Sequence, residues 1–257
     1  MNLIICDNDF DVARAAADRI ARDVDRRPHL VLGLPTGRTS IPLYARLAEA
    51  RRAGQCRFDR VVTFNLDEFV GLPASHPGSY RAFMARHCFE PLGIPPSHVH
   101  FLDGVAPDLE AECVSYEQQL ADAGGTDLQV LGLGANGHIG FNEPADALHA
   151  RTHCVRLCVE TRVANAGLFG GVLDRVPTEA LSMGMATILE ARALVLVAYS
   201  ADKRDAVTAM VEGLLTPRWP ASFLQLHPRV DVYLDEDAAS GLSPGTRRTA
   251  RRRCDDA

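Results

Sequence analysis

Lysine is nearly absent from this sequence: of its 27 basic residues, 26 are arginine and one, Lys203, is lysine. Long apolar runs are absent too, since no stretch approaches the ~18 consecutive apolar residues of a membrane-spanning helix. The N-terminus, MNLIICDNDF, has no basic region, and its apolar run is too short for a secretory signal. We therefore expect a cytoplasmic protein with no membrane partner.

The cysteines do not fit a disulfide framework. There are seven, an odd number, and no two form a C-x-x-C pair, so reduced and mostly buried thiols are expected. Cys154 and Cys158 stand four residues apart, a spacing that also occurs among metal ligands. The segment around them, HCVRLCVE, is more typical of a strand than of a helix. We therefore expect a structural role for both thiols and no metal site.

Composition narrows the class of protein. Hydrophobic residues make up 47% of the 257 residues and charged residues 23%, which excludes a wholly disordered chain and is sufficient for a large core. The net charge of −6 argues against broad nucleic-acid binding. An anionic small molecule remains a suitable ligand, because local positive charge and helix N-termini decide its binding.

Short apolar runs alternate with helical patterns along the chain. Continuous apolar strands in such an order favour a mostly parallel sheet with helices on both faces, the α/β class. We expect one α/β domain over residues 1–240 and a polar, mobile tail over 241–257, with no internal repeat. The expected strands are 3–6, 29–34, 60–65, 99–103, 128–134, 193–199 and 231–235, and the expected helices are 9–25, 41–53, 80–87, 108–122 and 202–214.

In open α/β sheets, ligands bind beyond the carboxyl ends of the strands. The loop after strand 29–34 reads Pro-Thr-Gly-Arg-Thr-Ser at residues 35–40. Gly37 permits close backbone approach, Thr39 suits a helix N-cap, and Arg38 adds a positive charge. Such a loop is suited to hold a phosphate at the start of a helix. An ordinary capped turn explains this loop equally well.

Two further loops carry acid and base groups. Asp67 and Glu68 follow the third strand; adjacent side chains diverge, so one can face a ligand while the other is structural. The loop after strand 128–134 follows Gly134 directly and holds Asn136, His138 and Glu143 together with two more glycines. Histidine is the side chain best suited to proton transfer near neutral pH, and a nearby carboxylate orients it. We expect a site of proton transfer at this loop.

Several long segments stand out along the sequence: GLPTGRTSIPLY, VVTFNLDEFVGLP, HPGSYRAFM, GANGHIGFNEP, TRVAN, ALSMGMATIL and LQLHP. Together they resemble the glucosamine-6-phosphate deaminase family, with the family's order and approximate spacing. The resemblance covers about residues 2–240. It implies a Rossmann-like α/β fold, shared more distantly with phosphogluconolactonases, and a reaction without metal or organic cofactor.

The resemblance also implies roles for particular residues. Asp67 matches the base that moves a proton between C2 and C1 of the sugar, and His138 matches the group that assists ring opening. Asn136 and Glu143 match the partners of that histidine, and some relatives have aspartate where Asn136 stands. Lys203 matches a lysine that contacts the substrate phosphate. The other expected substrate-binding residues are Thr36, Gly37, Arg38, Thr39 and Gly137.

The sequence departs from the family pattern in two places. Relatives usually carry an arginine shortly after TRVAN, in a mobile lid over the phosphate, but here Gly167 stands there. Conversely, Arg38 occupies a position where many relatives have glycine or serine. We hypothesise that Arg38 supplies the lost charge. The segment after Pro144 lacks the basic and hydroxyl-rich effector site of allosteric relatives, so we expect no activation by an N-acetylated sugar phosphate.

The predicted function is conversion of glucosamine 6-phosphate to fructose 6-phosphate and ammonia, in amino-sugar catabolism. The alternatives are deamination of another amino-sugar phosphate, such as the galactosamine epimer, and a sugar-phosphate sensor without catalysis. The retained Asp67 argues against a sensor, because binding alone needs no C2 base. The protein is expected to act on a small molecule, without nucleic acid, and a homo-oligomer is possible.

Overall fold

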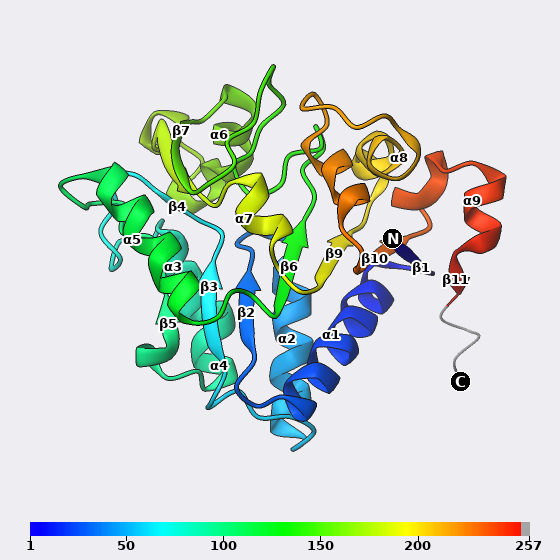
Figure 1. The fold of residues 1–257 in the computed structure, drawn as a ribbon, viewed down its shortest axis with the longest axis horizontal. Helices are drawn as coiled ribbons and strands as arrows, with labels where there is room; N and C mark the ends of the chain where they lie inside the picture. The colour runs from blue at the N-terminus through cyan, green and yellow to red at the C-terminus, as the bar shows by residue number, and fades with distance from the viewer. Residues whose placement is uncertain (253–257) are drawn as a thin grey trace.

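A parallel β-sheet runs through the centre of the molecule in the computed structural model, which describes residues 1–252 (Figure 1). All neighbouring strands in this sheet are parallel, which confirms the α/β class expected from the alternating pattern. The order across the sheet is β11 (Arg251–Arg252), β1 (Asn2–Cys6), β10 (Val230–Asp235), β9 (Leu194–Ala198), β6 (Leu128–Gly132), β2 (Val31–Leu34), β3 (Val62–Asn65) and β5 (Val99–His100).

Helices cover both faces of the sheet, because its central strands bury side chains on both sides (Figure 1). Successive residues of a strand point to opposite faces. In β9, Val195 and Val197 belong to one hydrophobic core, whereas Leu194 and Leu196 belong to a second. The first core is completed by α1 (Asp9–Arg26) and α2 (Ser40–Arg52), and the second by α5 (Leu109–Asp122), α7 (Met185–Leu189) and α8 (Arg204–Glu212).

A second, smaller sheet lies beside the carboxyl ends of the central strands (Figure 1). Its three strands are antiparallel, in the order β4 (Asp67–Phe69), β8 (Glu179–Ser182) and β7 (His153–Arg156). Asp67 and Glu68 were expected in a loop, and the structure corrects this to strand β4. The pairing joins segments more than 100 residues apart, so the local sequence around Asp67 does not reveal it.

The segment HCVRLCVE was expected to form one strand, and that prediction was too long. Only β7 is extended; the chain then enters helix α6 (Val159–Asn165). Cys158 is the N-cap of α6, and its sulfur accepts a hydrogen bond from the backbone N–H of Thr161 at 3.4 Å. No group of three or more metal-binding side chains occurs among residues 1–252.

Three predicted elements are shorter or less regular than expected. The helix expected over 80–87 is α3 (Tyr80–Met84), which leads through a π-helical turn into α4 (Glu90–Leu92). Pro91 explains the widened turn, because proline has no N–H and its ring clashes with the carbonyl four residues earlier. The strand expected over 99–103 is the two-residue β5, and the helix expected over 202–214 begins as a 3₁₀ turn.

The C-terminal segment is partly ordered. Residues 244–249 form helix α9 (Pro244–Thr249), and β11 pairs with Ile4 and Ile5 of β1. Residues 253–257 lie outside the described part of the chain, so the expected mobile tail and the domain boundary at residue 240 stay predictions. Among residues 1–252, no helix has both the length and the apolar character needed to cross a membrane.

Candidate active site

The polar loops of interest meet at the carboxyl ends of the central strands. Strands β3, β2, β6 and β9 are consecutive neighbours, so their carboxyl ends and the segments that follow them lie together. The segment after β2 holds residues 36–39, and the segment after β6 holds residues 136–143. Asp67 follows β3, and Lys203 follows β9. These carboxyl ends also border the small sheet (Figure 1).

Three predicted residues of the loop after β6 form one hydrogen-bonded chain. The Nδ1 atom of His138 lies 2.7 Å from the Oδ1 atom of Asn136. The Asn136 amide nitrogen donates to the Oε2 atom of Glu143 at 3.0 Å. The backbone N–H of His138 also donates to Oδ1 of Asn136, at 3.2 Å. The carboxylate therefore orients the amide, and the amide orients the imidazole.

The hydrogen bonds from Glu143 through Asn136 determine which nitrogen of His138 carries the proton. A carboxylate only accepts hydrogen bonds, so the group that Asn136 directs at Glu143 is its NH₂. The amide oxygen then faces His138, and an amide oxygen also only accepts. Nδ1 is consequently the protonated nitrogen of neutral His138, and Nε2 is left as the free base. The orientation follows from the network of donors and acceptors.

The charge of His138 responds to two neighbours. Burial lowers the pKa of His138, the Glu143 carboxylate raises it in part, and the Lys203 ammonium lowers it again. The net effect is a pKa below the ordinary value for histidine. Its side chain is still 28% exposed, so the imidazole can reach a ligand. A neutral imidazole at physiological pH is the form that can accept a proton.

Asp67 is a buried carboxylate without a complete set of partners. Its Oδ1 atom is buried and has no hydrogen-bond partner among the described residues. Burial raises the pKa of Asp67 well above the ordinary value, and the neighbouring Glu68 charge adds to the effect. Asp67 pairs with Ser182 across the small sheet, and Ser182 Oγ accepts from the backbone N–H of Phe141 at 3.1 Å. Asp67 is thereby tied to the histidine loop.

The distance between Asp67 and that loop is short. An added Cβ at Gly140 would lie 3.6 Å from Oδ2 of Asp67 and 3.1 Å from Oγ of Ser182. Gly140 also has a φ of +59°, where side chains are rarely found. A glycine at this position therefore lets the histidine loop approach the carboxylate. The base and the histidine predicted from sequence do lie on adjoining segments.

Glu68 plays a different part from its neighbour. Its carboxylate accepts backbone N–H bonds from Phe69 at 2.7 Å, Tyr80 at 2.9 Å and Arg81 at 2.9 Å. Burial raises the pKa of Glu68 to about 7, although these three hydrogen bonds lower it. Glu68 thus joins β4 to the start of α3. Of the two adjacent acids, Glu68 is the structural one and Asp67 keeps an unsatisfied oxygen.

The loop after β2 offers donors that nothing in the described chain uses. The hydroxyl oxygen of Thr36 is buried without a hydrogen-bond partner. The Arg38 side chain is exposed and, among residues 1–252, makes no ion pair or hydrogen bond, whereas its backbone carbonyl accepts from the N–H of Ile41 at 3.2 Å. Gly37 has a φ of +143°, a conformation that favours glycine. Thr39 stands at the N-cap of α2 without a side-chain cap bond, whereas Ser40 donates to the carbonyl of Gly37 at 2.7 Å.

Lys203 stands at the N-cap of α8, after β9. Its side chain is 17% exposed, and its Nζ atom is 3.0 Å from the carboxylate of Asp202. It is close enough to His138 to lower the pKa of that imidazole. The Tyr199 hydroxyl donates to the carbonyl of Thr39 at 3.3 Å, which joins the end of β9 to the loop after β2. The only lysine in the sequence therefore lies near His138.

Sequence reasoning missed two residues that support the histidine loop, Gly134 and Ser182. A Cβ at Gly134 would lie 2.3 Å from the His138 ring, so a side chain there would displace the imidazole. Ser182 Oγ accepts from the backbone N–H of Phe141 in this loop. Gly137, expected from sequence to bind substrate, has a φ of +83° and packs against the ring of Trp219, 2.6 Å from where its Cβ would stand. The three glycines of the loop were visible in the sequence, but their contacts were not.

The expected lid corresponds to α6 and the 3₁₀ turn Ala166–Phe169 that follows it. Gly167 is exposed, and an added Cβ would have no atom within 4 Å. The side chain expected here in relatives could therefore be accommodated. The mobility expected for this segment stays a prediction.

Sequence comparisons place known proteins beside this chain. A family model described as glucosamine-6-phosphate isomerases/6-phosphogluconolactonase matches residues 9–232. Glucosamine-6-phosphate deaminase of Mycolicibacterium smegmatis is 46% identical over 247 residues, covering 94% of this chain and 93% of that protein. Glucosamine-6-phosphate deaminase 2 of Bacillus subtilis is 44% identical over 243 residues, covering 94% of this chain and 98% of that protein.

Solved structures agree with the sequence relatives. A structure described as a monomeric glucosamine-6-phosphate deaminase superposes with a TM-score of 0.90 at 39% identity, covering 94% of this chain and 100% of that one. The 6-phosphogluconolactonase of Trypanosoma cruzi superposes with a TM-score of 0.75 at 19% identity, covering 94% and 97%. The second likeness concerns the fold alone.

Proposed function

This chain belongs to the family of glucosamine-6-phosphate isomerases and 6-phosphogluconolactonases, and on that premise we propose that it is a glucosamine-6-phosphate deaminase. It converts glucosamine 6-phosphate and water to fructose 6-phosphate and ammonia. The observation that supports this most strongly is the pairing of an oriented, neutral His138 with a buried, incompletely partnered Asp67 at one sheet edge. A lactonase needs no base at C2, whereas a deaminase does.

The phosphate is the first group to be placed. We propose that the Thr36 hydroxyl and the Arg38 guanidinium hold it with the backbone at Gly37 and Thr39, and that Lys203 contacts it from the other side. A buried hydroxyl without a partner and an unpaired arginine fit an anion better than an ordinary turn. Anchoring the phosphate sets the position of the sugar ring relative to the proton-transfer groups.

Ring opening follows from the state of His138. The C1 hydroxyl must lose a proton and the ring oxygen must gain one. Nε2 of His138 is the free base of a neutral imidazole, so it can accept the first proton and return it to the ring oxygen. Glu143 favours the imidazolium formed between these steps, because its negative charge raises the pKa of His138. Gly137 gives the loop its conformation.

Isomerisation and deamination then use Asp67. Its carboxylate removes the C2 proton, and the C–H electrons form the C1–C2 double bond. The C=O π electrons of the aldehyde move to its oxygen, which takes up a proton from solvent and becomes the hydroxyl of an enolamine. Proton delivery to C1 leaves an iminium at C2, and water adds there to release ammonia. The raised pKa of Asp67 makes it a stronger base than an exposed carboxylate. The residues need no metal or organic cofactor for these steps.

Several predictions accompany this function. The galactosamine epimer is the alternative substrate, because nothing in the named residues selects the C4 hydroxyl. Cytoplasmic location, the single domain over residues 1–240 and the absence of an allosteric effector site stay predictions. A homo-oligomer also stays a prediction, and one similar solved structure is described as monomeric.

The test is to incubate the purified protein with glucosamine 6-phosphate and to measure ammonia and fructose 6-phosphate together. We expect equimolar release of both, lost in Asp67→Asn. The galactosamine epimer is assayed in parallel, and faster turnover of that sugar would replace the proposed substrate. Binding of either sugar phosphate without release of ammonia would favour the sensor.

A further inference from the structure

The start of helix α6 lies directly against Glu143. The hydroxyl of Thr161 donates a short hydrogen bond to Oε1 of Glu143, and the thiol of Cys158 donates to the same oxygen at 3.4 Å. The other carboxylate oxygen, Oε2, accepts from Asn136. Each oxygen of Glu143 is thus held from a different segment: one from α6 and one from its own loop.

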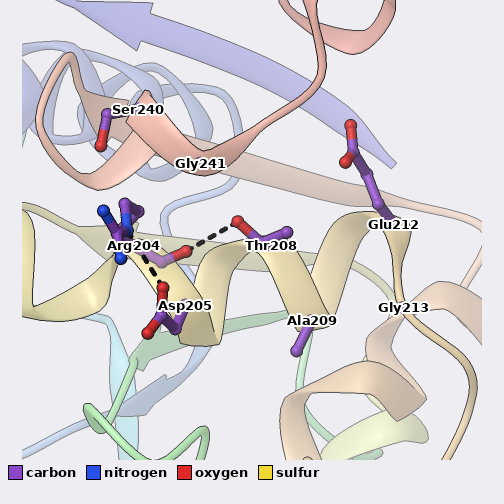
Figure 2. Close-up of a pocket in the computed structure, with 8 residues that line it drawn as sticks. All are labelled: Arg204, Asp205, Thr208, Ala209, Glu212, Gly213, Ser240 and Gly241. Carbon is purple, nitrogen blue, oxygen red and sulfur yellow. Dashed lines mark hydrogen bonds and ion pairs between the residues drawn. The ribbon is translucent and has the colours of Figure 1, made fainter.

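Thr161 lies in the first turn of α6 and directs its hydroxyl at Glu143. A threonine further inside a helix often donates to the backbone carbonyl four residues earlier, a partner that the helix does not offer to its first turn. Thr208 in α8 does so, donating to the carbonyl of Arg204 at 2.9 Å, as the dashed line in Figure 2 shows. Thr161 is buried, and its hydroxyl contacts the carboxylate and the Cys158 sulfur instead. The Thr161 hydroxyl therefore belongs to the series of hydrogen bonds that runs through Glu143 and Asn136 to His138.

Cys158 is an unusual N-cap. Serine, threonine, aspartate and asparagine are the residues that cap helices well, whereas a thiol is a weak donor and acceptor. Here the Cys158 sulfur accepts from the backbone N–H of Thr161 and faces Glu143. The side chains of Cys158 and Thr161 thus belong to the start of α6 and also contact the Glu143 carboxylate.

Helix α6 does not depend on Glu143 for its position. The guanidinium of Arg162 donates to the carbonyls of Leu173 and Val176 at 3.0 and 3.1 Å. The Tyr80 hydroxyl donates to the Asn165 side chain at 2.8 Å. Removing one hydroxyl at Thr161 should therefore leave the helix in place, and the main loss is restraint on the carboxylate.

From these contacts we propose that Thr161 and Cys158 are positioning residues: from the first turn of α6 they fix Glu143, and through Asn136 they fix His138. The proposal rests on the ring-opening role of His138. It connects the segment expected to act as a lid to the proton-transfer group. Movement of α6 would then change the orientation of the histidine as well as access to the substrate.

The test compares Thr161→Val with Thr161→Ser and with the control Thr208→Val. Valine keeps the shape of threonine and removes the hydroxyl. Thr208 lines a pocket beside α8 whose lining includes none of the candidate-site residues (Figure 2). We expect Thr161→Val to lower kcat by about 10- to 100-fold, with a small change in KM, because loss of the general acid–base group itself costs about 10²–10⁴-fold and a positioning residue should cost less. Thr161→Ser should recover most of kcat, and Thr208→Val should behave as the wild type.

A second measurement separates positioning from general loss of structure. Glu143 raises and Lys203 lowers the pKa of His138, and these are the charged groups that act on it. A loosened Glu143 lowers that pKa further, so the His138 limb of the kcat/KM profile, and the histidine titration by NMR, should move to lower pH in Thr161→Val. The thermal midpoint is measured for each variant.

The outcomes are distinct. Thr161→Val with the kcat and histidine titration of Thr208→Val would overturn the proposal. If Thr161→Val does not fold, Cys158→Ala takes its place, with the same shift in the His138 titration expected and its absence counting against us. If the wild type releases no ammonia, the proposed function fails, yet the NMR titration of His138 still decides whether α6 controls its environment.

Discussion

Nδ1 of His138 lies 2.7 Å from Oδ1 of Asn136, and the amide of Asn136 lies 3.0 Å from Glu143. A neutral amide thus stands between the histidine and the carboxylate. The amide transmits orientation, because each end can only donate or only accept, but it adds no charge beside the imidazole. Control of the tautomer and control of the pKa are therefore separate at this site: Asn136 supplies the first and Glu143 the second.

Asn136→Asp separates these two effects. An aspartate keeps an oxygen acceptor beside Nδ1 and adds a negative charge within hydrogen-bond distance, so it raises the pKa of His138 by about 1 unit or more. We expect the His138 limb of the kcat/KM profile to move to higher pH by that amount. A profile that does not move would show that His138 is not the group behind that limb.

Asp67→Asn tests the cost of a buried base. In the folded protein burial raises the pKa of Asp67, so above its ordinary pKa the native state retains a proton that the unfolded state has lost. The contribution of Asp67 to stability is therefore lost as pH rises, at up to about 1.4 kcal/mol per pH unit. The variant should be inactive, and its thermal midpoint relative to the wild type should increase from pH ~4 upward.

The measurement is calorimetry of both proteins over this pH range. About 1 kcal/mol corresponds to roughly 2–4 °C for a chain of this size, so the trend is measurable. A midpoint difference that stays constant with pH would contradict the assigned burial.

Glu68→Ala should reduce stability. It removes the acceptor of three backbone N–H groups, those of Phe69, Tyr80 and Arg81, and a buried unsatisfied donor costs about 1–3 kcal/mol. We expect a loss of about 3 kcal/mol in the free energy of unfolding, measured with urea. Glu110→Ala, at an exposed position in the first turn of α5, is the control and should change stability by ~0.5 kcal/mol. Equal losses would mean that Glu68 does not hold α3.

Arg38→Ala should weaken substrate binding. An arginine–phosphate contact is worth about 1.5–3 kcal/mol, so KM should rise at least ~10-fold with little change in kcat. The control is Arg26→Ala, in the last turn of α1, near the amino ends of the strands. Gly167→Arg in the Arg38→Ala background should restore part of the affinity, because the position has free space. If Arg38→Ala and Arg26→Ala give the same KM, Arg38 does not bind phosphate.

Most strands of the central sheet, the helices α1, α2, α5 and α8, and the three loops at the carboxyl ends of the strands could be predicted from the sequence, because apolar periodicity is a local property. The short helices α6, α7 and α9 were not predicted. The small sheet could not be predicted this way, since Asp67 pairs with Ser182, a partner more than 100 residues away. The division of labour between Asp67 and Glu68 was left open for the same reason: the donors that occupy Glu68 lie on α3. The family resemblance supplied the identity of the site residues, whereas the tautomer of His138 and the contacts of Thr161 needed coordinates.

The measurement that tests this account most directly is ¹⁵N NMR of the histidine ring nitrogens, with His138 assigned through His138→Gln. Above the pKa of His138, the account predicts a proton on Nδ1 and none on Nε2 in the ligand-free protein. It also predicts that Asn136→Leu, which cannot accept from Nδ1, gives a mixture of tautomers. Finding the proton on Nε2 in the wild type would contradict the assignment of Nε2 as the base that opens the sugar ring.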